Sequence, residues 1–263
     1  MSELGAGAWT AALVLFCALE AALGRTRGET LYTKDWTLST AGCAALRAAV
    51  VLPLLPLFAA AYAWLGRFAP ARLPAASLAT WALAWLELSF LEYWIHRLEH
   101  RPGLLWALHS VHHQPEELNA SVSQRSHALA ALIEWPPLLL LALSGIPPET
   151  FAAVAAVHNA YGLLLHARLI GNLGWLGRVL ITPAQHAVHH GTQPEHLGRN
   201  FSGSLRLWDE LFATLALPTT PPRFGLMTPY QGRGVWAANL EPLACWLRAR
   251  AARERFTRAR EFT

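Results

Sequence analysis

The sequence predicts an all-α fold: an integral membrane helical bundle of about four to five spanning or hairpin helices, with a cytoplasmic helical cap. The first observation behind this prediction is composition, because 54% of the 263 residues are hydrophobic and only 14% are charged. A soluble globular protein has about a quarter of its residues charged. The second observation is that the apolar residues gather in long runs. The third is a set of closely spaced histidines that begins where one of these runs ends.

Five apolar runs are long enough to cross a bilayer as helices. A helix rises ~1.5 Å per residue, so ~18–20 residues cover a hydrocarbon core ~30 Å thick. A soluble domain of this size could not cover five such helices, which argues against buried core helices. The third run leads directly into His96, and the last two, joined by Gly145, Pro147 and Pro148, predict a hairpin that dips into the membrane and returns. The runs are 5–24, 48–65, 74–95, 128–146 and 149–165.

Loop charges predict the orientation of the chain in the membrane. The loop after the first run holds four arginines or lysines, whereas the loop after the second holds two. Basic loops stay inside, and three spans precede His96. The amino terminus is therefore expected outside, with the histidine-rich half and the carboxyl terminus cytoplasmic. Lys34 is the only lysine, and this bias toward arginine is typical of a high-GC genome, so we expect a bacterial inner membrane.

The chain is expected to fold as a single domain, 1–263. Residues 1–95 would form the membrane helices that lead to the first histidines, 96–214 the catalytic histidine-cluster region, and 215–263 a C-terminal cap and basic tail. No internal repeat is visible beyond the histidine clusters. Six arginines in the last 16 residues predict contact with anionic lipid headgroups, or a solvated helix, rather than binding of nucleic acid.

Nine of the twelve histidines fall in a pattern that predicts metal ligands. One pair has the spacing HxxxH, two triplets have the spacing HxxHH, and one further histidine lies between the triplets. On a helix, positions i, i+3 and i+4 share one face, so each cluster projects its imidazoles in one direction. Crowded imidazoles repel one another when protonated and need partners when buried, and a metal ion removes both difficulties. The predicted ligands are His96, His100, His109, His112, His113, His166, His186, His189 and His190.

This number of nitrogen ligands predicts two metal ions. A structural zinc site closes at about four ligands, and a catalytic one uses roughly three from the protein. Two ions that share the set fit better. Two redox-active irons could bind O2 and reach an oxidant able to attack an unactivated C–H bond. We expect no catalytic residue beyond the metal ligands themselves.

Two other interpretations remain open. His96, Glu99 and His100 satisfy H-x-x-E-H, the pattern of a zinc-dependent membrane hydrolase in which Glu99 would be the general base, but this leaves both triplets unexplained. The second is a non-catalytic membrane protein that carries metal or haem; haem would need isolated histidines facing each other across helices. The remaining three histidines stand alone, which is more typical of a surface or core residue than of a ligand, although His127 and His158 stay open as ligands.

With these motifs in place, residues 93–214 resemble the fatty acid hydroxylase/sterol desaturase superfamily of membrane histidine-cluster di-iron oxygenases. The segments YWIHR followed by His100, HSVHH at 109–113 and HAVHH at 186–190 resemble its three histidine boxes. His166 stands where the family has a single histidine. Asn200-Phe201 and LWDELFAT at 207–214 resemble the closing signature. Each motif alone is weak, and together they are highly specific.

The resemblance implies a bundle of four or more membrane helices with a cytoplasmic cap that holds two iron ions. It implies an O2-dependent hydroxylase or desaturase acting on an aliphatic position of a membrane lipid. Sterols, fatty acyl chains, ether lipids and carotenoids present similar C–H bonds, so all of these stay open as substrates. The chain has no room for a fused cytochrome b5 and no G-x-G-x-x-G before a helix. An external electron donor of the cytochrome b5, ferredoxin or reductase type is therefore implied.

Three positions depart from the family pattern. Ser89, Arg168 and Gly198 stand where the family commonly has an acid, an asparagine and an aspartate. We expect these departures to affect rate and substrate more than metal binding. Side chains that hold imidazoles in the right tautomer are expected nearby. The candidates are Glu92, Glu99, Asn119, His127, Asn200 and Asp209.

Overall fold

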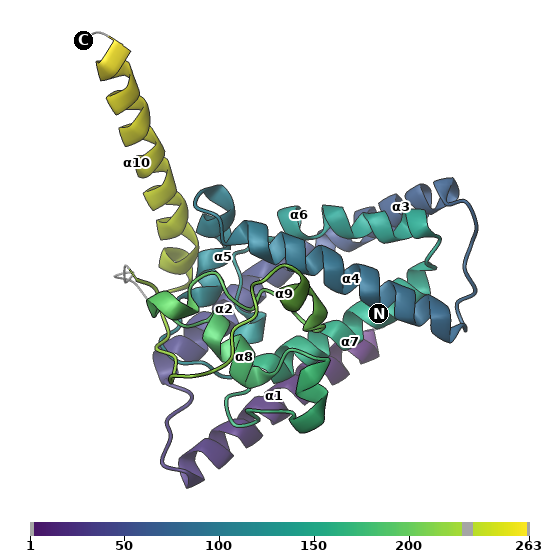
Figure 1. Ribbon diagram of the computed structural model, residues 1–263, viewed down its shortest axis with the longest axis horizontal. Helices are drawn as coiled ribbons and strands as arrows, with labels where there is room; N and C mark the ends of the chain where they lie inside the picture. Colours follow the sequence, from purple (N-terminus) through teal and green to yellow (C-terminus); the bar gives the residue numbers. More distant parts are fainter. Residues whose placement is uncertain (1–2, 228–233, 262–263) are drawn as a thin grey trace.

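A computed structural model describes residues 3–227 and 234–261, and in these ranges the chain is all-helical (Figure 1). The sole β pairing among them is an isolated bridge between Leu180 and Leu205. The expectation of an all-α fold is confirmed. The α-helices are α1 (Glu3–Thr26), α2 (Lys34–Val51), α3 (Leu55–Leu65), α4 (Leu78–Glu99), α5 (Leu104–His113), α6 (Ala131–Glu134), α7 (Pro148–His166), α8 (Pro183–His189), α9 (Leu207–Leu211) and α10 (Val235–Glu261).

Short 3-10 helices connect or extend these elements. Proline stands at the first or second position of three of them, where the N–H that it lacks would have no helical partner. They are η1 (Leu52–Leu54), η2 (Gly66–Phe68), η3 (Ala120–Gln124), η4 (Pro136–Ser144), η5 (Gly174–Arg178) and η6 (Pro194–His196).

Among the described residues, one helical segment is both long and apolar enough to cross a membrane: Lys34–Phe68, which joins α2, η1, α3 and η2 over 35 residues. The apolar run read from the sequence began later, at residue 48. The reason is that the charged Arg47 interrupts the apolar pattern; in the structure its guanidinium pairs with Glu134 at 2.6 Å. A second apolar helix, Ala131–Ser144, is shorter. The number of spanning helices therefore stays a prediction.

The expected hairpin has its turn at Gly145, between η4 and α7. Gly145 has φ 81°, and a Cβ there would lie 2.0 Å from the carbonyl oxygen of Ala71, so only glycine fits. The first arm differs from the expected α-helix, because Pro136 begins a 3-10 helix of nine residues. Both arms contribute to a core with α3 and α4 that includes Leu88 and Val154.

The cap is built where α4 and α7 end. The short helices α5, α8 and α9, with the coil around them, gather at this end, while α10 extends from the body on its own (Figure 1). α10 begins against α5 and α2. The arginines of the basic tail from Arg253 onward belong to α10, but their side chains lie outside the described residues.

Glu20 ties α1 to the cap. Its carboxylate accepts hydrogen bonds from the Tyr32 hydroxyl at 2.6 Å, the Ala120 amide at 2.9 Å and the Arg168 amide at 2.8 Å. We expect Glu20→Ala to lower the free energy of unfolding by about 1–3 kcal/mol, because it leaves buried donors unpaired. A thermal melt in detergent measures this. Glu29→Ala is the control, since Glu29 meets the same Arg168 at the surface and should change little; equal effects of the two substitutions would contradict the role of Glu20.

Candidate metal centre

Four helices bring their carboxyl-terminal ends to one place. α4 supplies His96 in its last turn and ends at its cap His100, and α5 ends on His113. α7 ends on His166, and α8 ends with His190 as its cap. The carboxyl end of a helix carries a partial negative charge of roughly half an elementary charge. Four such ends around one volume favour a bound cation.

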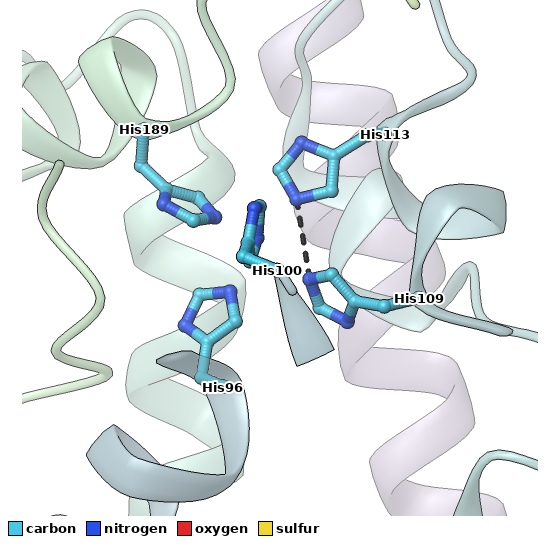
Figure 2. A group of neighbouring side chains, drawn as sticks. All are labelled: His96, His100, His109, His113 and His189. Atoms are coloured by element: carbon cyan, nitrogen blue, oxygen red, sulfur yellow. Dashed lines mark hydrogen bonds between the residues drawn. The ribbon is translucent and has the colours of Figure 1, made fainter. Parts of the chain in front are cut away.

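The nine predicted ligands all converge, and they separate into two groups. In each group, one side-chain nitrogen per residue lies within 4.8 Å of the others. Figure 2 shows the rings of the first group pointing toward a common centre from separate segments of the chain. The first group is His96, His100, His109, His113 and His189, and the second is His112, His166, His186 and His190.

In the structure, the place of a histidine within its cluster goes with the group that it joins. In each cluster the histidines at i and i+4 enter the same group, as with His109 and His113 in the first group and His186 and His190 in the second. The histidine at i+3 crosses to the other group, so His112 joins the second and His189 the first. Each triplet therefore supplies rings to both groups. The His113 ring of the first group stacks on the His190 ring of the second, with 4.3 Å between their centroids.

The spacing of the nitrogens fits ligands of shared ions. In the second group, Nε2 of His166 lies 3.0 Å from that of His112, 3.1 Å from that of His186 and 3.2 Å from that of His190. Nitrogens bound at about 2.1 Å to one ion would lie roughly 3.0–3.4 Å apart in octahedral or tetrahedral geometry. An all-imidazole donor set suits iron, zinc, copper or nickel.

Backbone carbonyls fix the tautomers of several rings. The Nδ1 atoms of His112 and His166 donate to the carbonyls of Arg125 and Gly162, at 3.0 Å and 2.7 Å. A carbonyl can only accept, so in the neutral rings both Nε2 atoms carry lone pairs. These two lone pairs face each other at 3.0 Å, an arrangement that repels unless a cation lies between them.

The first group is anchored in the same way. His96 Nδ1 donates to the carbonyl of Phe201 at 2.7 Å, and His189 Nδ1 donates to that of Arg199 at 2.9 Å. The Nε2 atoms of His96, His100 and His189 are buried and have no hydrogen-bond partner within the described ranges. Buried polar atoms without a partner are rare and costly, and a metal ion would satisfy all three.

Burial keeps these rings in the neutral form that binds metal. Desolvation lowers the pKa of His109 to about 4. Desolvation, followed by repulsion from neighbouring imidazoles, lowers the pKa of His186, His189 and His190 well below the ordinary value of 6.5. Neutral imidazole is the ligand form, so at neutral pH no proton must leave before a metal ion binds.

Of the expected supporting acids, Glu99 contacts a ring directly. Its Oε2 lies 3.1 Å from Nδ1 of His109, where it can hold the proton on that nitrogen and leave Nε2 for the metal. Glu99 is buried. Because it contacts Nδ1 and not Nε2, it lies on the side of the His109 ring that points away from the first group's centre.

Asp209 and Asn200 act through the coil that carries the two carbonyl anchors of the first group. The Asp209 carboxylate accepts from the amides of Phe201 at 2.8 Å and Ser202 at 3.0 Å, and from the Thr214 hydroxyl at 2.7 Å. Asn200 has φ 54°, and its side chain hydrogen-bonds three backbone groups of α8 and the segment after α9. Both residues hold the anchoring carbonyls rather than the rings.

The other expected supporting residues lie away from both groups. Glu92 meets His158, with 2.8 Å between the carboxylate and Nε2. The Asn119 side chain caps η3. His127 accepts from a nearby backbone amide through Nδ1, and its Nε2 lies 3.0 Å from the carbonyl of Asn239 in α10. The imidazoles of His127 and His158 thus have partners elsewhere.

Arg125 is a positioning residue to which the sequence analysis assigned no role. The backbone carbonyl of Arg125 holds His112. Its side chain is fully buried and donates to the carbonyl of Val111 and to the hydroxyl of Ser39, both at 2.8 Å. It also donates to the Gln114 amide oxygen. These bonds fix the end of α5. Its signal in the sequence is its place, with Asn119 and His127, in the stretch after the second histidine box that resembles the family.

Comparison with known proteins agrees with this geometry. A family model described as fatty acid hydroxylase matches residues 81–214, just over half of the chain. An alkylglycerol monooxygenase of Danio rerio is 34% identical over 227 residues, which cover 84% of this chain and 50% of that protein. The Homo sapiens alkylglycerol monooxygenase is 35% identical over 150 residues, 57% of this chain and 34% of that protein.

A third relative is a bacterial enzyme. The ornithine lipid hydroxylase of Rhizobium tropici is 32% identical over 133 residues, 49% of this chain and 39% of that protein. The chain thus spans half or less of the length of these curated relatives. No solved structure matches it. The matched family segment contains all nine converging histidines, and the chain belongs to the fatty acid hydroxylase family, within the fatty acid hydroxylase/sterol desaturase superfamily.

Proposed function

We propose that the two histidine groups bind two iron ions and that the chain is a membrane lipid hydroxylase. It would insert one atom of O2 into an aliphatic C–H bond, with desaturation as the related outcome. The observation that supports this most strongly is the pair of lone pairs on His112 and His166, fixed face to face by backbone carbonyls. The names of the three relatives, two alkylglycerol monooxygenases and an ornithine lipid hydroxylase, favour a lipid with a polar headgroup.

When bound, the irons would supply the O2 chemistry that side chains cannot perform. The protein's own residues do the rest. The first group would hold one ion through five imidazoles and the second would hold the other through four. Glu99 and the carbonyls of Arg199 and Phe201 keep protons on the outer ring nitrogens. The buried surroundings exclude water from the centre.

The remaining proposals concern the setting of the enzyme. We place the chain as one unit in a bacterial inner membrane, with the metal centre and the carboxyl terminus cytoplasmic. The apolar Lys34–Phe68 segment supports membrane insertion. Several further helices would lie in or across the bilayer. The reducing equivalents would come from a separate donor of the cytochrome b5, ferredoxin or reductase type.

The zinc hydrolase alternative fits the geometry less well. Glu99 contacts the outer nitrogen of His109, so it is not placed as a general base at an open metal position. A catalytic zinc typically has about three protein ligands, whereas His96 and His100 share a group of five. A haem carrier would need isolated axial histidines, which two close groups of rings do not provide.

The test of the proposed function uses the purified full chain. We expect about two irons per chain, no Soret band, and O2 uptake that depends on reductant and a lipid. Incubation with alkylglycerols and with ornithine lipids should give a product heavier by one oxygen atom, or lighter by two hydrogens, in mass spectrometry. Turnover of lipid without O2, or a protein that binds zinc and excludes iron, would overturn the proposal.

A further inference from the structure

Three polar side chains meet between α4, α7 and the coil after α8, outside both histidine groups. His158 Nε2 lies 2.8 Å from Glu92 Oε2 and 3.1 Å from Ser204 Oγ. His158 and Ser204 are buried, whereas the Glu92 side chain is 30% exposed. We refer to Glu92, His158 and Ser204 as the Glu92 cluster.

The Glu92 carboxylate is held on its buried side. Its Oε2 is buried and lies 2.8 Å from His158 Nε2, and the same Nε2 forms a hydrogen bond with Ser204. The Glu92 side chain is nevertheless 30% exposed. Its other carboxylate oxygen is therefore left to accept from a ligand that brings an O–H or N–H group.

The surroundings close this cluster on several sides but leave Glu92 reachable. The backbone at Gly203 packs so closely that a Cβ there would lie 3.0 Å from His158 Cε1 and 3.5 Å from Glu92 Oε2. The ring of Trp85 lies 5.5 Å from that of His158. An ionisable pair between apolar helices of a membrane protein usually marks a substrate or ion site rather than a structural contact.

The position of the Glu92 cluster relates it to the metal centre. Glu92 precedes His96 by one helical turn on α4, a rise of ~6 Å. His158 precedes His166 by about two turns on α7, a rise of ~12 Å. α4 and α7 pack against each other. A group bound at Glu92 would therefore lie beside the metal centre, on the side from which these two helices approach.

We propose that the Glu92 cluster binds a hydroxyl or amide N–H of the lipid's polar headgroup and so positions the acyl or alkyl chain against the metal centre. This rests on the proposed function, and it assigns to Glu92 the role of recognising a hydrogen-bond donor. Glu92 accepts from the headgroup, and Ser204 and His158 hold each other in place beside it.

The experiment measures equilibrium binding of two radiolabelled lipids to the full, metal-loaded protein without reductant, so that no turnover occurs. The lipids are hexadecylglycerol and its analogue with both hydroxyls methylated. The wild type should prefer the free diol by roughly ten- to a hundredfold, and Glu92→Gln should lose most of this preference while binding the methylated lipid as before. Glu87→Gln is the control on the same helix, because Glu87 interacts with Ser144 instead.

Retained iron in Glu92→Gln shows that the variant is folded. The proposal is overturned if the wild type binds both lipids equally or neither measurably, or if Glu92→Gln weakens both lipids alike. A uniform fall in turnover with unchanged affinity would point to proton delivery and would also overturn it. Binding does not depend on oxidation. A wild type that discriminates between the lipids but oxidises neither would therefore contradict the proposed function and leave this inference standing.

Discussion

His112→Ala and His189→Ala are each expected to lower the iron content from about two ions to about one per chain and to reduce turnover by more than a hundredfold. Each substitution removes a ring from a different group, and the groups share no member. Substitution of a residue that only supports a metal ligand already lowers metal affinity or activity by about 10–100-fold, so loss of a ligand should lower them further. Metal analysis and O2 uptake of the purified variants provide the measurement.

The two variants should also differ from each other. His112→Ala leaves three imidazoles in the second group, whereas His189→Ala leaves four in the first, so the second group should lose its ion more completely. His127→Gln is the matched control, because His127 is a buried histidine bonded to α10 rather than to either group; it should keep both ions. Two irons and full turnover in both alanine variants would exclude these histidines as ligands.

The set of nine converging histidines could be predicted from spacing, but their division could not. A helix puts i, i+3 and i+4 on one face, and that rule made each HxxHH triplet look like a unit. The structure instead sends His112 and His189 across to the opposite group. Periodicity alone cannot distinguish two centres that both lie within reach of one helix face.

The all-helical fold class was predictable, and the ends of the helices were not. Apolar runs identify helices whose whole circumference is apolar. Most of α2 fell outside the predicted run because that run began after the charged Arg47, which pairs with Glu134 in the structure. The turn at Gly145 was visible from its glycine and prolines, whereas the close approach to Ala71 that requires the glycine is a contact between distant segments.

The groups that orient the rings were the least predictable part of the site. His96, His189 and His112 are held by the carbonyls of Phe201, Arg199 and Arg125. Every residue carries a carbonyl, so the sequence offers no signal for which one will serve. The side chains that fix those carbonyls leave a fainter trace, as the Asn200-Phe201 pair and Asp209 did.

Asp209→Asn is expected to reduce turnover by about 10–100-fold and to weaken iron binding by the first group. Both carboxylate oxygens of Asp209 accept backbone amides, from Phe201 and Ser202. Asparagine can accept at one oxygen only, and its NH2 would face a second donor, so the coil must shift. The Phe201 carbonyl that orients His96 would shift with it.

The stability of Asp209→Asn should fall as well, by about 1–3 kcal/mol, because a buried amide is left without an acceptor. Glu210→Gln separates this effect from a general loss of charge in α9: Glu210 is the next residue, and it pairs with Arg206 at the surface, where such pairs contribute little. A positioning role predicts that Asp209→Asn alters the iron spectrum and the retention of one ion, whereas a purely structural role would lower the melting temperature and leave the folded fraction fully active. Full specific activity of the folded Asp209→Asn protein would therefore show that the Phe201 carbonyl does not need this carboxylate to hold His96.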